Sequence, residues 1–146
     1  MKKLFPFFLT LLLCGCAILR PEEAPPVNIE TLSQIGTSGY FCVTEEKQEP
    51  TESDGINCAV FFHKVYDPDA EYLTTLTVTI LGSYDESTQS ASIPNISVSL
   101  SDDTIEGLST SQHLSGDTAT VILYRNQMSV CHFQYRVYPD GTISLL

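Results

Sequence analysis

Few residues in this chain have the types and spacing that catalysis requires. Among its 146 residues are three histidines and five cysteines, and serine is abundant. Nucleophilic catalysis needs a serine or cysteine beside a histidine that a third group orients. The chain has no G-x-S-x-G motif, and with so many serines a triad can be drawn anywhere and indicates nothing. We therefore predict that the protein is not an enzyme.

The histidines and cysteines also lack the spacing of a metal site, because they form no C-x-x-C or H-x-x-x-H motif. Cys131 and His132 are neighbours in a predicted strand, so their side chains point to opposite faces and cannot share an ion. The acidic stretches 67–71 and 101–106 do not have EF-hand spacing, and we interpret them as solvated turns. We predict neither a metal nor a cofactor.

Two of the five cysteines lie near the N-terminus, behind an apolar stretch. Lys2 and Lys3 precede the ten mostly apolar residues Leu4–Leu13, after which the chain reads Cys14-Gly15-Cys16. A helix of that length cannot span a hydrocarbon core of ~30 Å, but a basic start followed by a short apolar run is typical of a secretory signal peptide.

The residues Leu13-Cys14-Gly15-Cys16 resemble the lipobox of bacterial lipoproteins, with Leu at −3, a small residue at −2 and Gly at −1. The resemblance implies that the signal peptide is cut before Cys16 and that Cys16 carries a diacylglycerol on its thiol. Two or three acyl chains hold a protein firmly at a bilayer, whereas one holds it weakly. The alternative is an ordinary cleaved secretory signal without lipid.

We therefore expect a membrane-anchored, extracytoplasmic lipoprotein. Ala17 after the modified cysteine resembles an outer-membrane sorting signal, so we expect the outer membrane if the organism has one, and otherwise the outer face of the cell membrane. The net charge of −11 repels phosphate backbones, and we predict no nucleic-acid partner.

The chain divides into three parts. Residues 1–15 are the predicted signal peptide, and residues 16–37 hold the lipidated cysteine, a tether rich in proline and glutamate, and a short helix beginning near Asn28. Residues 38–146 are long enough for one domain with one hydrophobic core.

This last part has the alternating pattern of half-buried strands. We expect strands at 39–46, 58–66, 72–81, 95–101, 118–125, 128–138 and 142–146. Polar connections are expected at 47–57, 82–92 and 102–117, the last with room for a helical turn. About seven strands without intervening helices predict an all-β fold, a small antiparallel β-sandwich or a partly open barrel.

The last three strands can be aligned with one another from their turns. The stretch 138–142 reads as a tight turn, which pairs Val137 with Ile143. If Arg125 faces Ser129, then Leu123 meets Cys131, and one face is apolar across all three strands. We predict a C-terminal antiparallel meander in this register.

Three cysteines remain after the predicted cleavage: Cys42, Cys58 and Cys131. A turn near Pro50 would place Cys42 across from Cys58, and an oxidising compartment permits a bridge between them. We predict a Cys42–Cys58 disulfide with Cys131 as a free buried thiol, although an odd count allows other pairings.

The meander also leaves one face outside, and this face has no acidic residue. Its prominent side chains are Ile122, Tyr124, His132, Gln134, Arg136 and Tyr138. Tyr and Arg are enriched at binding hot spots, so we hypothesise that this face binds a partner. The alternatives are an ordinary solvated face and a face covered by the helix at 29–35.

Together these features predict a lipid-anchored envelope protein whose non-catalytic β domain binds a partner protein or an envelope component. The second hypothesis is a lipoprotein that captures or inhibits a small ligand or peptide, and the third is an envelope enzyme. An exposed partner face favours the first hypothesis, whereas a concave pocket with convergent polar groups favours the other two.

Overall fold

The computed structural model describes residues 39–51, 53–102 and 104–146, and this part contains eight strands and no helix. The strands are β1 (Phe41–Pro50), β2 (Ile56–Tyr66), β3 (Tyr72–Asp85), β4 (Ser90–Leu100), β5 (Leu108–Ser115), β6 (Thr118–Arg125), β7 (Met128–Val137) and β8 (Ile143–Leu145). The predicted all-β class is confirmed. The predicted signal peptide, tether and short helix lie outside the described residues.

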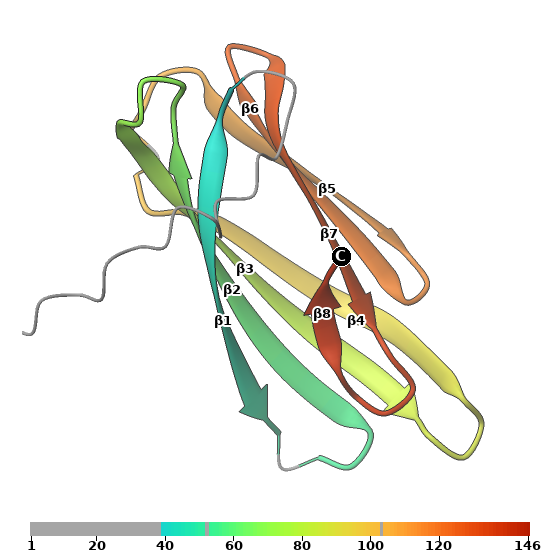
Figure 1. Cartoon of the computed structure of the whole chain (residues 1–146). Helices are drawn as coiled ribbons and strands as arrows, with labels where there is room; N and C mark the ends of the chain where they lie inside the picture. Colours follow the sequence, from blue (N-terminus) through green and yellow to red (C-terminus); the bar gives the residue numbers. More distant parts are fainter. Residues whose placement is uncertain (1–38, 52, 103) are drawn as a thin grey trace, which may run out of the picture.

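The strands form two antiparallel sheets that pack face to face (Figure 1). Sheet A has the order β1-β2-β3-β4 and sheet B the order β5-β6-β7-β8, so each sheet is a meander of consecutive strands. Between them lies one core, in which Phe61 and Ile80 of sheet A and Val121 and Phe133 of sheet B are fully buried. Of the two predicted architectures, the structure is therefore the sandwich.

The C-terminal register is confirmed at the predicted pairs, including Leu123 with Cys131 and Val137 with Ile143. It differs at the hairpin end, where Arg125 pairs with Met128 instead of Ser129. The reason is a β-bulge beside the turn, where Val130 is an extra residue between the pairs made by Ser129 and Cys131. Val130 and Cys131 are both buried, which a regular alternating strand would not allow.

The first long connections are shorter than predicted. The loop expected at 82–92 is mostly strand, because β3 continues to Asp85 and β4 begins at Ser90. The Asp85 side chain accepts backbone hydrogen bonds from Ser87 and Thr88, at 2.9 and 3.2 Å, and so stabilises a tight turn. The loop expected at 47–57 is likewise reduced, because β1 extends to Pro50.

The connection expected at 102–117 contains the eighth strand, β5. This strand pairs along its whole length with β6, from Leu108 opposite Arg125 to Ser115 opposite Thr118. Its side chains are almost all exposed, so no apolar alternation marks it in the sequence. Backbone hydrogen bonds to β6, whose alternate side chains are buried, therefore hold β5 in place. The helical turn expected in this connection is not present among its described residues.

Two contacts between the sheets fix the C-terminal end of the sandwich. The Gln48 side chain donates to the carbonyl of Ile143 at 2.8 Å, and the Asn57 side chain donates to the carbonyl of Gly141 at 3.0 Å. Gly82 lies in a bulge of β3, where a Cβ atom would be only 2.9 Å from the Val137 side chain. The two sheets approach closely here because residue 82 has no side chain.

Candidate functional site

The six residues of the predicted binding face share one side of sheet B, the side turned away from sheet A. Ile122 pairs with His132, and the flanking residues Val121, Leu123 and Phe133 point into the core. Strand alternation therefore turns the predicted set outward. We call this surface the outer face of sheet B, defined by Ile122, Tyr124, His132, Gln134, Arg136 and Tyr138.

Arg136 is the centre of the interactions on this surface. Its Nε donates to a carboxylate oxygen of Asp117 at 2.8 Å, and its guanidinium carbon lies 5.8 Å from the centre of the Tyr138 ring. The neighbouring Asp117 raises the pKa of the guanidinium, so Arg136 is always charged. Both partners of the ion pair are partly solvated, and such pairs add little stability.

The strands of sheet B contain no aspartate and no glutamate. The chain as a whole has 18 acidic residues, and β1 alone has three glutamates in its ten residues. Asp117 lies next to the outer face of sheet B, and its carboxylate is paired with Arg136. Burying this surface against a partner therefore removes no uncompensated carboxylate from water, which would be costly.

Strand β5 extends this surface, although the expected strands did not include it. Ser111 pairs with Ile122 and His113 with Thr120, and the Ser111 hydroxyl donates to the Tyr124 hydroxyl at 3.4 Å. Ser111 and His113 therefore lie on the same side as the outer face of sheet B, and both are exposed. The available signal was the bracketing of residues 108–115 by Gly107 and Gly116, both of which have positive φ.

A polar network that links the two sheets lies in the core and is centred on His63. His63 is 0% exposed and its ring stacks on Phe133, with centroids 3.9 Å apart. Its Nδ1 lies 2.7 Å from the Thr44 hydroxyl, and its Nε2 lies 2.6 Å from the Tyr135 hydroxyl. Burial lowers the pKa of His63 to about 4 and raises that of Tyr135, so both are neutral near pH 7.

This network joins β1 and β2 of sheet A to β7 of sheet B. Both ring nitrogens of His63 have partners, and no buried side-chain polar atom lacks one in the described part of the chain. His63 and Tyr135 are enclosed, so neither can reach a substrate in solution. We interpret the network as structural, a polar tie between the sheets.

The predicted Cys42–Cys58 disulfide does not form in the structure. Cys42 pairs with Val65, and Cys58 pairs with Glu49, seven pairs further along, because β1 runs as a regular strand to Pro50 and the turn comes only after it. All three cysteines of the described residues are free thiols, and Cys131 is buried as predicted.

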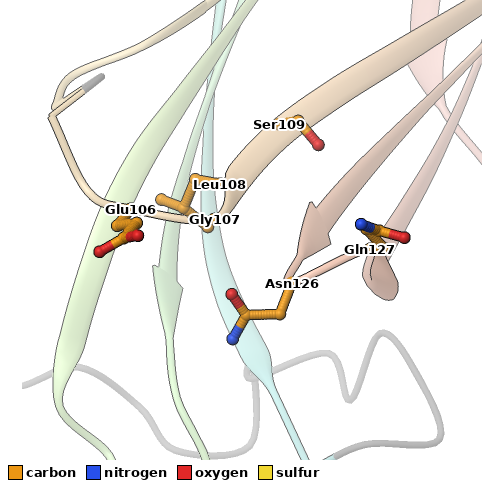
Figure 2. A pocket seen from close by; sticks show the side chains of 6 residues that line it. All are labelled: Glu106, Gly107, Leu108, Ser109, Asn126 and Gln127. Atoms are coloured by element: carbon orange, nitrogen blue, oxygen red, sulfur yellow. The ribbon is translucent and has the colours of Figure 1, made fainter.

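Among the open depressions in the described part of the chain, two are lined by residues in or beside turns. One, of about 360 Å³, lies at the β6–β7 turn, and Figure 2 shows its Glu106, Asn126 and Gln127 side chains pointing in different directions. The other, of about 520 Å³, lies between the β1–β2 and β3–β4 turns and has Asp85 and Glu86 at its edge. Small-molecule sites require convergent polar groups, so neither depression supports a ligand-capture function.

Within the described ranges, no three His, Cys, Asp or Glu side chains come together as a metal site. The same residues include no helix long and apolar enough to cross a membrane. No family model matches the chain, and no match to it was found among curated proteins or solved structures. The described part of the chain is a two-sheet antiparallel β-sandwich.

Proposed function

We propose that the protein is a lipid-anchored extracytoplasmic protein whose β-sandwich binds a partner protein through the outer face of sheet B. The observation that carries the proposal is the absence of Asp and Glu from all four strands of that sheet, in a chain with a net charge of −11. Charged residues are depleted at the centres of protein interfaces, whereas Tyr and Arg are enriched there.

The anchoring half of the proposal rests on Leu13 to Cys16, which lie outside the described residues. Metabolic labelling with a fatty acid tests it directly. Cys16→Ser should abolish labelling and leave the protein uncleaved or released from membranes. A Cys16→Ser protein that is still labelled with the fatty acid, or that is cut to the wild-type size and stays on the membrane after a carbonate wash, contradicts the anchor.

The binding half is tested by capture from membranes with the full-length lipidated protein. The variant Tyr124→Ala/Arg136→Ala removes an aromatic and a cationic side chain from the outer face of sheet B. The matched control Lys64→Ala/Tyr72→Ala removes the same two kinds of side chain from the opposite sheet, where both are exposed. We expect the first variant to lose at least roughly tenfold in partner capture, as truncated hot spots do, and the control to capture normally.

Thermal unfolding separates binding from folding. Tyr124 and Arg136 lie outside the core, so their substitution should leave the unfolding midpoint nearly unchanged. If Tyr124→Ala/Arg136→Ala unfolds, the face is structural. If it captures the partner normally, or if the sheet A control loses capture instead, the proposed binding surface is wrong.

A further inference from the structure

Two of the three thiols are buried in the same core although they belong to different sheets. Cys42 is on β1 of sheet A and Cys131 on β7 of sheet B, and each is 1% exposed. Both belong to the single apolar cluster between the sheets, so both side chains point inward. Cys58, in contrast, alternates with the buried residue Ala59 and lies on the outer side of sheet A.

Contacts on both sides of Cys42 lead to residues beside Cys131. Two residues before Cys42, the Tyr40 hydroxyl accepts a hydrogen bond from Arg125 at 3.2 Å, and Figure 1 shows the start of β1 beside the β6–β7 hairpin. Arg125 is two residues from Leu123, the cross-strand partner of Cys131.

Two residues after Cys42, the Thr44 hydroxyl meets His63, whose ring stacks on Phe133. Phe133 is two residues from Cys131 on the same face of β7. Contacts between the two sheets therefore lie on both sides of Cys42 along β1, and each reaches a residue close to Cys131.

The stacking of the two sheets also places Cys42 next to the residue that faces Cys131. Phe61 packs on Tyr135 with ring centroids 4.9 Å apart, and His63 packs on Phe133 at 3.9 Å. Moving two residues forward along β2, from Phe61 to His63, thus corresponds to moving two residues back along β7, from Tyr135 to Phe133. The next step brings Val65 over Cys131, and the cross-strand partner of Val65 in β1 is Cys42.

We propose that Cys42 and Cys131 form a disulfide between the two sheets in the exported protein. The proposal rests on the extracytoplasmic location proposed above, because disulfides persist in oxidising compartments. The pKa of Cys131 is consistent with two neighbouring thiols, since burial and the nearby Cys42 raise it to about 12.

A bridge requires Cα atoms about 4.4–6.8 Å apart, which is less than the ~10 Å between stacked sheets. As the edge strand of sheet A, β1 is hydrogen-bonded on one side only, to β2. To form the bridge, β1 has to shift toward β7 relative to that single neighbour.

The oxidant is a small or protein disulfide of the envelope. The Cys42 thiolate attacks it to give a mixed disulfide and one released thiol. The Cys131 thiolate then attacks the Cys42 sulfur, which forms the bridge and releases the second thiol. The two electrons and the two thiol protons of the protein thus leave on the former disulfide. Because both thiols are buried with raised pKa values, this exchange occurs before the sandwich closes, and the folded reduced protein reacts slowly.

Mass mapping of the full-length protein from membranes tests the pairing. Free thiols are alkylated during extraction, and the protein is then digested without reduction. We expect the peptides of Cys42 and Cys131 to be joined, with both thiol hydrogens lost, and Cys58 to be alkylated. In parallel, the purified protein is reduced, unfolded and refolded with oxidised and reduced glutathione, which should restore the same bridge.

The two arms separate this proposal from the proposed function. A bridge that forms on refolding but is missing in the membrane-derived protein upholds the pairing and contradicts the extracytoplasmic location. Alkylation of Cys42 and Cys131 in both arms, or a bridge that includes Cys58, overturns the pairing.

Unfolding midpoints give a second readout. Cys42→Ala and Cys131→Ala should each lower the midpoint by roughly 8–16 °C without reductant, and the double variant should lower it little further, because one bridge is lost in all three. Reductant should produce a similar decrease in the wild type. Cys58→Ala is the matched control and should leave the midpoint unchanged. Additive effects of the two single variants contradict the bridge.

Discussion

His63 should make the stability of this protein depend on pH between about 4 and 6.5. Its ring is fully buried, and burial holds its pKa at about 4, below the ordinary value of 6.5. Below pH 6.5 the unfolded chain therefore binds a proton that the folded chain excludes. The resulting stabilisation is complete above pH 6.5 and is lost as the pH falls toward 4.

The size of the effect follows from the difference of 2.5 between these two pKa values. At 1.36 kcal/mol for each pKa unit, the free energy of unfolding falls by about 3 kcal/mol between pH 6.5 and pH 4. The aspartates whose pKa values are shifted, Asp85, Asp102 and Asp140, are all lowered from 3.8 and titrate below this window. The loss within the window should therefore come mainly from His63.

The perturbation that isolates His63 is His63→Phe, which keeps a ring against Phe133. At pH 7 this variant should lose about 1–3 kcal/mol, because the Tyr135 hydroxyl is left buried without its partner. The double variant His63→Phe/Tyr135→Phe removes both polar partners and should recover most of that loss. Both variants lack the buried imidazole, so both should show a flatter pH dependence than the wild type.

Urea unfolding at half-unit steps from pH 4 to pH 7.5 measures these free energies. His132→Gln is the matched control, because His132 is an exposed histidine on β7 and its loss should preserve the slope. If His63→Phe/Tyr135→Phe keeps the full slope, or if His132→Gln removes it, the assignment of the pH dependence to His63 is refuted.

Two further substitutions probe the packing between the sheets. Gly82→Ala should cost about 1–3 kcal/mol, because the new Cβ overlaps the buried Val137 side chain; chemical denaturation measures the loss, and an unchanged midpoint contradicts the close approach at Gly82. Tyr135→Phe alone should cost about 1–2 kcal/mol at pH 7, because it leaves one nitrogen of His63 unpaired, and the same titration measures it.

The sequence was most informative where one face of a strand is buried. In β6, β7 and β8, apolar residues alternate with polar ones, and a slip of one residue would turn Val121 and Phe133 into solvent. That penalty selects one register, and the turn at 138–142 selects the same one. The fold class, the C-terminal register and the composition of the outer face of sheet B were therefore predictable.

The sequence was uninformative where backbone pairing acts without side-chain burial. Strand β5 is polar on both faces, and apart from the glycines at its two ends, Gly107 and Gly116, only the hydrogen bonds to β6 reveal it. The disulfide prediction placed the β1–β2 turn several residues too early, because Lys47, Gln48 and Glu49 are exposed and resemble a loop. Likewise, a pairing of Cys42 with Cys131 depends on how two sheets stack, and no local pattern records that.

The β6–β7 turn provides a final prediction that separates stability from binding. Its two central residues, Asn126 and Gln127, have φ of 50° and 67°, the left-handed region that a type I′ hairpin requires. Asparagine tolerates this region, and the Asn126 backbone N–H also donates to the Gly107 carbonyl at 2.8 Å. The position to substitute is therefore Gln127, with Asn126 left unchanged.

Gln127 is exposed, and its positive φ is strained for a residue with a Cβ atom. Gln127→Gly should therefore raise the free energy of unfolding by about 0.5–1 kcal/mol, the relieved strain exceeding the added entropy of the unfolded chain. Ser129→Gly, in the adjoining strand, is the matched control and should destabilise by a similar amount. The turn is not part of the outer face of sheet B, so Gln127→Gly should capture the partner as the wild type does. A loss of capture in this stabilised variant would place the binding surface at the β6–β7 turn instead.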